Sequence, residues 1–182
     1  MKNILTIDFD IIMYECEELY NNQVPHQSWE KLKNNPIYSL FYGDLKLHHK
    51  LTKLLLKHTK LLSSNNFHFI ESHENIINYL PKDENFSITN IDYHHDVAYN
   101  EKDGENLINE LSCANWVKYC SDNNYPISEY NWINADSSTY PPEHLIQKFI
   151  KNIENVNIFN IKMHQYDEII ICLSCPWVPP NY

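Results

Sequence analysis

Residues 92–96 bring two acids and two imidazoles close together, as Asp92, His94, His95 and Asp96. In an extended chain, side chains two positions apart share a face, so Asp92, His94 and Asp96 form a D-x-H-x-D pattern that can converge. Acids clustered at the end of a strand repel one another unless a cation compensates their charge. The pattern therefore predicts a metal site. His95 lies on the opposite face and is predicted to be a structural residue or to support the ligands from behind.

Further candidate ligands follow two other apolar segments. Asp8 and Asp10 form a D-x-D pattern, and His73 adds an imidazole. Taken singly these are weaker signals, because acids that end strands often cap helices and a lone histidine more often lies on the surface. Together, four carboxylates and two imidazoles suit a hard divalent ion such as manganese and match the ligand count of a two-metal site. Structural zinc, which favours thiolates, fits them poorly.

The elements that would position these residues alternate along the chain. Apolar runs predict strands over 3–9, 67–71, 87–92, 129–133, 155–161 and 167–174, and helical spacing predicts helices over 44–62, 74–80, 104–122 and 141–154. Alternating strands and helices predict a three-layer α/β/α fold with a mainly parallel sheet and helices on both faces. Ligands bind beyond the carboxyl ends of such strands, so all the candidate ligands would meet at one edge.

Composition narrows the function classes. The 182 residues suit a single domain, 1–182, and the net charge of −10 argues against nucleic acid while permitting a cationic partner. Only two glycines occur, so there is no glycine-rich phosphate loop. No apolar run is long enough to span a bilayer, the N-terminus lacks signal-peptide character, and the five cysteines form no paired zinc motif. These features predict a cytoplasmic protein without membrane contact.

These motifs resemble those of the arginase and deacetylase superfamily. Its arginase-like members ligate two manganese ions through a lone histidine, a D-x-H-x-D motif and a D-x-D motif. Here the D-x-D comes first and the chain is short, so the resemblance implies a compact arginase-like core with rearranged motif order. The segments LTIDFD, IDYHHD, NWVKY and YNWIN look closer to the peptide arginases, which convert arginine side chains in ribosomally made peptides to ornithine.

The resemblance implies a mechanism. Two Mn²⁺ would be held by Asp8, Asp10, His73, Asp92, His94 and Asp96. A hydroxide bridging the two ions would attack the guanidinium carbon and release urea, with Asp92 and Asp8 as the bridging carboxylates and Asp96 handling the proton. The proton-shuttle histidine of arginases has no clear counterpart, and His95 and His164 are the candidates.

Substrate contacts are assigned more loosely. Glu71 could bind the guanidinium with two oxygens, or be a solvated acid at a strand end. Asp136 lies in a polar segment after a strand, and Trp116 could line a peptide groove or pack in the core. The implied partner is an arginine-containing precursor peptide, and the oligomeric state is left open.

Two other functions compete with this interpretation. One is a different metal-dependent amidohydrolase or deacetylase, which in this superfamily uses a single zinc. The other is a non-catalytic, metal-stabilised protein that binds cationic peptides. Metal stoichiometry and the conversion of arginine to ornithine separate the three.

Overall fold

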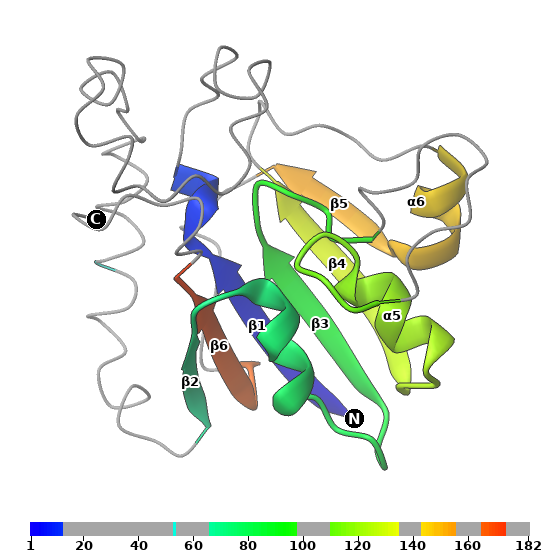
Figure 1. Ribbon diagram of the computed structural model, residues 1–182, viewed down its shortest axis with the longest axis horizontal. Helices are drawn as coiled ribbons and strands as arrows, with labels where there is room; N and C mark the ends of the chain where they lie inside the picture. Colours follow the sequence, from blue (N-terminus) through cyan, green and yellow to red (C-terminus); the bar gives the residue numbers. More distant parts are fainter. Residues whose placement is uncertain (13–52, 54–65, 98–109, 135–142, 156–164, 174–182) are drawn as a thin grey trace.

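The computed structural model describes residues 1–12, 53, 66–97, 110–134, 143–155 and 165–173 (Figure 1). Its centre is a six-stranded sheet in which every pair of neighbouring strands is parallel. The strands are β1 (Lys2–Asp8), β2 (Phe67–Ile70), β3 (Phe86–Ile91), β4 (Ile127–Asn134), β5 (Asn152–Asn155) and β6 (Glu168–Cys172). The predicted α/β class with a parallel sheet is confirmed.

The strand order is β2-β6-β1-β3-β4-β5. From β1, the chain places β2 on one side of the sheet, and then places β3, β4 and β5 on the other side in succession. The direction of winding therefore reverses between the neighbours β1 and β3. In open parallel sheets, the carboxyl ends of the two strands at such a reversal border the crevice in which ligands bind.

Three of the described helices pack on one face of the sheet, namely η3 (His73–Asn78), α5 (Trp116–Asp122) and α6 (Glu143–Phe149). The short η1 (Phe9–Ile12) continues directly from β1, and its Ile11 packs in the apolar cluster of the other face (Figure 1). Side chains from all three helices join a cluster with alternate residues of the strands, and its largest fully buried members are Trp116, Trp132, Tyr130 and Phe86. No helix among the described residues is long and apolar enough to cross a membrane.

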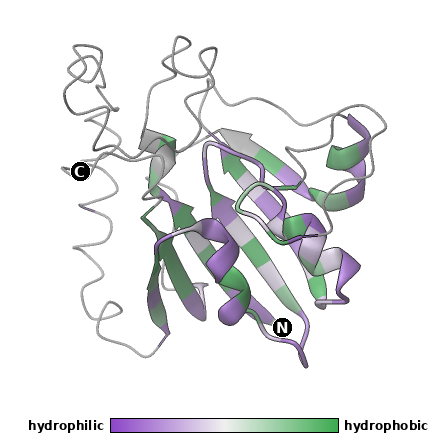
Figure 2. Cartoon of the chain, in the orientation of Figure 1, coloured by the Kyte–Doolittle hydropathy of each residue, from purple (hydrophilic) through white to green (hydrophobic). Residues whose placement is uncertain are grey.

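The opposite face of the sheet carries a second, smaller apolar cluster. Leu5, Ile7 and Ile91 point to it from the two central strands, and Ile169 and Ile171 from β6. Both faces of a parallel sheet are normally covered, so a central strand carries apolar side chains to both, as Figure 2 shows for the nearly continuous apolar run of β6. The helix predicted over 44–62 lies outside the described residues apart from residue 53, so the third layer stays a prediction.

Several element boundaries differ from the prediction, and two of the differences have a clear physical cause. The helix predicted over 141–154 ends at Phe149, and β5 begins at Asn152 instead of residue 155. The N–H of Lys151 donates to the carbonyl oxygen of Tyr130 at 2.8 Å, so pairing with β4 overrides the helical periodicity. Of the helix predicted over 104–122, the structure describes residues 110–122, and within them the helix begins at Trp116. The side chain of Asn115 holds a turn before it: its Oδ1 accepts from the N–H of Ser112 and its Nδ2 donates to the carbonyl oxygen of Glu110.

Candidate metal centre

Three buried side chains converge at the carboxyl edge of the central strands. Asp8 ends β1, Asp92 follows β3, and His73 begins η3. One ligand atom from each lies within 4.8 Å of the other two. This group could hold a metal ion, as the pattern of strand-end residues predicted.

Strand register explains why these residues meet. Ile7 of β1 pairs with Ile91 of β3, so Asp8 and Asp92, one position further on, stand side by side. Ile4 of β1 packs in the helix-side core, and the alternation of a strand brings Asp8 to that same face. There η3 supplies His73, because the short segment after β2 turns directly into that helix.

The imidazole of His73 is surrounded by acids. Its Nδ1 lies 3.3 Å from an oxygen of Asp8, 3.0 Å from Asp92 and 2.7 Å from Asp96. In an octahedral site, neighbouring ligand atoms lie about 2.1 Å from the ion and at right angles to one another, so they are about 3 Å apart. The measured distances match the spacing of such neighbouring ligands. None of the three oxygens makes a properly directed hydrogen bond with Nδ1. The spacing of these atoms therefore suits a shared cation.

The electrostatics of the cluster point the same way. Burial lowers the pKa of His73, but the charge of Asp96 and contacts with the other two acids outweigh it and leave that pKa well above its ordinary value. Burial and the neighbouring charge of Asp92 raise the pKa of Asp96 to about 8. Burial also raises the pKa of Asp92, but His73 outweighs this and sets it well below the usual range. The buried acids thus attract any positive charge within reach.

Hydrogen bonds from neighbouring residues orient the ligands. Nε2 of His73 lies 2.9 Å from the hydroxyl of Thr6, so a protonated Nε2 would donate to Thr6 and leave Nδ1 as the ligand atom. The amide of Asn90 donates to Asp92 at 3.0 Å, and the indole N–H of Trp116 donates to Asp96 at 2.7 Å. Metal ligands are usually held by such partners, which tune affinity.

Sequence reasoning missed Thr6 and Asn90. Each stands two positions before a ligand and therefore on the same face of its strand, so the alternation rule could have found both. A third supporting residue, Tyr130, needed the tertiary structure. Its hydroxyl accepts a hydrogen bond from the Asn90 amide at 2.9 Å and donates to the carbonyl of His95 at 3.1 Å.

Strand alternation does not account for the positions of the remaining predicted ligands. β1 ends at Asp8 and Asp10 lies in η1, so the alternation of a strand does not place their side chains on one face. The position of the Asp10 side chain is not among those described. β3 likewise ends at Ile91, and Asp96 has a φ of 51°. Asp96 reaches the cluster through this irregular backbone. His94 is not in the group formed by the described residues: its N–H donates to Asp92 and its ring lies against Tyr93.

His95 has a structural environment. Its ring is buried, stands edge-on to Trp132 and accepts a hydrogen bond from the N–H of Val97 at 3.1 Å. Burial lowers the pKa of His95 to about 4, so the ring is neutral near pH 7. These contacts support the loop after β3.

The predicted substrate contacts are dispersed. Glu71 is exposed at the end of β2. Trp116 is fully buried in the core, in agreement with the alternative that it packs there and does not line a peptide groove. Its indole N–H donates a hydrogen bond to Asp96. Asp136 and His164 lie outside the described residues.

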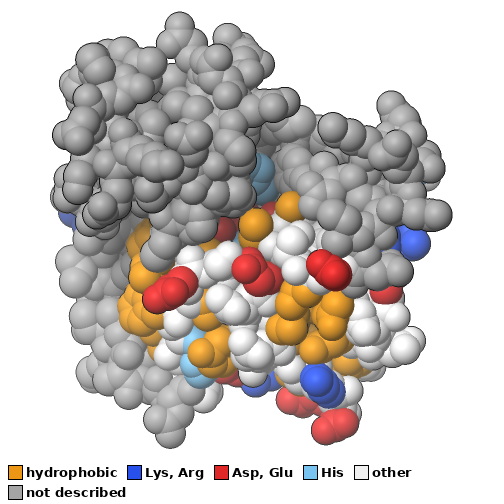
Figure 3. Space-filling model, in the orientation of Figure 1, with side chains coloured by type: hydrophobic (Ala, Val, Ile, Leu, Met, Phe, Trp, Pro, Cys, Tyr) orange, Lys and Arg blue, Asp and Glu red, His pale blue; other side chains and the backbone are white. Residues whose placement is uncertain are grey.

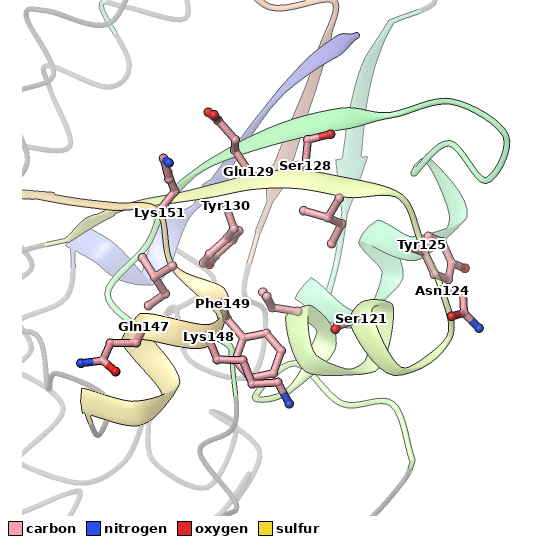
Figure 4. Close-up of a pocket in the computed structure, with 13 residues that line it drawn as sticks. Ser121, Asn124, Tyr125, Ser128, Glu129, Tyr130, Gln147, Lys148, Phe149 and Lys151 are labelled. Carbon is pink, nitrogen blue, oxygen red and sulfur yellow. The ribbon is translucent and has the colours of Figure 1, made fainter.

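A groove elsewhere on the helix-bearing face offers no comparable chemistry. It has a volume of about 520 Å³ and lies between α5, α6 and the start of β4 (Figure 4). Its charged lining residues are Glu129, Lys148 and Lys151, and Figure 4 shows them pointing in different directions. The buried acids, not this groove, are the best candidate for a functional site.

Comparison with known proteins adds no relative. No protein-family model, no characterised protein and no solved structure matches this chain. The geometry of the site is therefore the observation that bears on function.

Proposed function

We propose that this protein is a metal-dependent hydrolase that binds two Mn²⁺ and converts arginine side chains in a precursor peptide to ornithine and urea. The observation that supports this most strongly is the convergence of three carboxylates on Nδ1 of His73, at distances of 2.7–3.3 Å. Buried acids in this number require compensating positive charge. Divalent ions bound there would lower the pKa of a coordinated water and make hydroxide available near neutral pH.

The residues of this chain would divide the remaining tasks. Asp8, His73 and Asp92 would hold the first cation, and Asp10 and His94 are the proposed ligands of a second. Asp96, in contact with the same imidazole, would take up the proton released by the attacking water. Glu71 is the proposed partner of the substrate guanidinium, because its exposed carboxylate can form two parallel hydrogen bonds with it.

The charge of the protein suits a cationic substrate. The net charge is −10, and acidic side chains are spread over the described part of the helix-bearing face (Figure 3). Acidic surfaces raise the local concentration of positive ligands and speed their association. An arginine-containing peptide is such a ligand.

The test combines metal analysis with peptide mass. Protein purified in the presence of Mn²⁺ is expected to hold two equivalents per chain and to remove one CH₂N₂ unit from an arginine peptide, with urea in equal amount. One equivalent or none would contradict the two-metal proposal. Two equivalents without a change of mass on a panel of arginine peptides would contradict the substrate.

Two matched variants test the assignment of faces. Asp92→Asn keeps the size of the side chain but removes its charge, and should abolish both metal retention and turnover. His95→Asn keeps an acceptor for the N–H of Val97 and should retain both metals and most activity. Greater loss of metal in His95→Asn than in Asp92→Asn would show that the ligands are wrongly assigned.

A further inference from the structure

A row of four buried side chains crosses the carboxyl edge of the sheet. Asp8 pairs in register with Cys172 of β6, and continuing the β1–β3 and β3–β4 registers by one residue adds Asp92 and Asn134. The N–H of Asp92 donates to the carbonyl of Ile133 at 3.1 Å, which fixes this last pairing. Neighbouring strands are about 4.8 Å apart, so Asn134 stands next to a metal ligand.

The carboxamide of Asn134 faces the same side as that ligand. Tyr130 and Trp132 of β4 point into the helix-side core, and Asn134 continues their alternation. The indole N–H of Trp132 donates to the backbone oxygen of Asp92 at 3.1 Å, which shows that this side of β4 lies against the metal centre.

Asn134 is the unexplained member of the row. It is 0% exposed, and neither its Nδ2 nor its Oδ1 has a hydrogen-bond partner in the structure as described. Leaving one buried polar group unpaired costs about 1–3 kcal/mol, and here both ends of one amide are unpaired. Asn90, one layer below, differs: its Nδ2 makes two hydrogen bonds and only its Oδ1 is unpaired, so Asn134 is the one of the two amides with neither end satisfied.

We propose that Asn134 binds the reacting end of the arginine side chain, an inference that rests on the proposed function. A guanidinium has N–H donors and no acceptor, so the bound substrate can satisfy only Oδ1. When the oxygen of water adds to the guanidinium carbon, that oxygen becomes an acceptor for Nδ2. The bond from this carbon to the arginine Nε then breaks, the nitrogen leaves as the protonated amine of ornithine, and the carbon leaves as urea.

Asn134 would therefore make one hydrogen bond in the ground state and two from the transition state onward. Interactions that strengthen only in the transition state raise kcat, whereas those equal in both states affect KM alone. Loss of one such donor typically costs a factor of about 100–1,000 in kcat. An amide side chain offers a donor and an acceptor side by side, and these can pair with the oxygen and an N–H of urea.

Variants at this position separate the two hydrogen bonds. Asn134→Asp keeps the acceptor and should preserve the KM for an arginine peptide while lowering kcat by about 100-fold. Asn134→Ala should raise KM as well as lower kcat. The control is Asn131→Asp on the same strand. The Oδ1 of Asn131 accepts an exposed hydrogen bond from the Nδ2 of Asn152 at 2.7 Å, so this variant should leave kcat and KM unchanged. Unchanged kcat in Asn134→Asp, or loss of a metal equivalent in Asn134→Ala, would overturn the proposal.

Thermal unfolding gives a readout that does not depend on turnover. Asn134→Leu replaces the unpaired amide with an apolar side chain of similar size, and without substrate its unfolding midpoint should equal or exceed that of the wild type. A clearly lower midpoint would show that the amide serves the fold, and would overturn the inference. If the wild type fails to convert arginine peptides while Asn134→Leu is stabilised, the proposed reaction fails and the amide remains a site for another ligand.

Discussion

At the scale of single residues, the site is organised by pairs that share one face of a strand. Thr6 precedes Asp8 by two positions and Asn90 precedes Asp92 by two, and Thr6 and Asn90 pair in register. Each strand thus presents a candidate metal ligand at its end and a hydrogen-bonding side chain just before it. These hydrogen bonds orient the ring of His73 and the carboxylate of Asp92, two of the residues that could hold a metal ion.

Removal of the Thr6 hydroxyl should weaken metal binding without unfolding the protein. Thr6→Val keeps the shape of the side chain but leaves Nε2 of His73 without its partner, and such losses typically reduce metal affinity about 10–100-fold. Calorimetric titration with Mn²⁺ would measure the change. Thr89→Val, at a half-buried position of β3 paired with Leu5, is the control, and an equal loss of affinity there would contradict the role of Thr6.

Cys120 should make stability depend on alkaline pH. Burial raises the pKa of its thiol from 9.0 to about 12. Above pH 9 the unfolded chain loses this proton while the folded chain keeps it, so the contribution to the free energy of unfolding is complete below pH 9 and declines between pH 9 and 12. Denaturant unfolding of the wild type and Cys120→Ala should show a difference that is constant below pH 9 and shrinks above it. A difference that is independent of pH would contradict this.

At the scale of elements, the ends of helices and strands place the functional residues. α5 ends in a Schellman motif, in which the N–H of Tyr125 donates to the carbonyl of Cys120 at 2.9 Å and the N–H of Asn124 to that of Ser121 at 3.2 Å. Asn124 has a φ of 58°. This sharp stop directs the chain from α5 into β4, whose far end carries Asn134.

Glycine should therefore be favoured at position 124. Asn124→Gly removes the steric cost of the left-handed conformation and should raise the free energy of unfolding by a few tenths of a kcal/mol, whereas Asn124→Ala should lower it by about 1 kcal/mol. Chemical denaturation measures both. Because the motif is distant from the metal ligands, manganese affinity should stay unchanged; equal stability of the two variants would contradict the helix-end argument.

At the scale of the whole molecule, the buried acids would link the proposed metal binding to folding. The fold places Asp8, Asp92 and Asp96 around one imidazole, and repulsion among acids held this close opposes folding. A cation that binds only the folded state removes this penalty and adds binding free energy.

Removal of metal should lower the stability of the protein. At a free Mn²⁺ concentration of 100 Kd, one bound ion contributes about 2.7 kcal/mol. For a chain of this size, that corresponds to a shift of the unfolding midpoint of about 5–10 °C. Scanning calorimetry with Mn²⁺ and with a chelator measures the shift, which should vanish in Asp92→Asn. An equal shift in that variant would show that the metal binds elsewhere.

The sequence by itself determined the class of the fold and the core of the site. Alternating strands and helices predicted the parallel sheet, and residues that follow apolar strands predicted Asp8, His73 and Asp92. Both follow from local pattern, because a strand's carboxyl end is marked by where its apolar run stops.

Only the tertiary structure decided the neighbours of these ligands. The order of strands, set by pairing between segments far apart in the chain, brought Asn134 beside Asp92 and Tyr130 beneath Asn90. Strand alternation failed beyond Asp92, where pairing with β4 ends for this segment, and the left-handed backbone of Asp96 then carries its carboxylate to His73. Such contacts depend on long-range packing, which local periodicity does not encode.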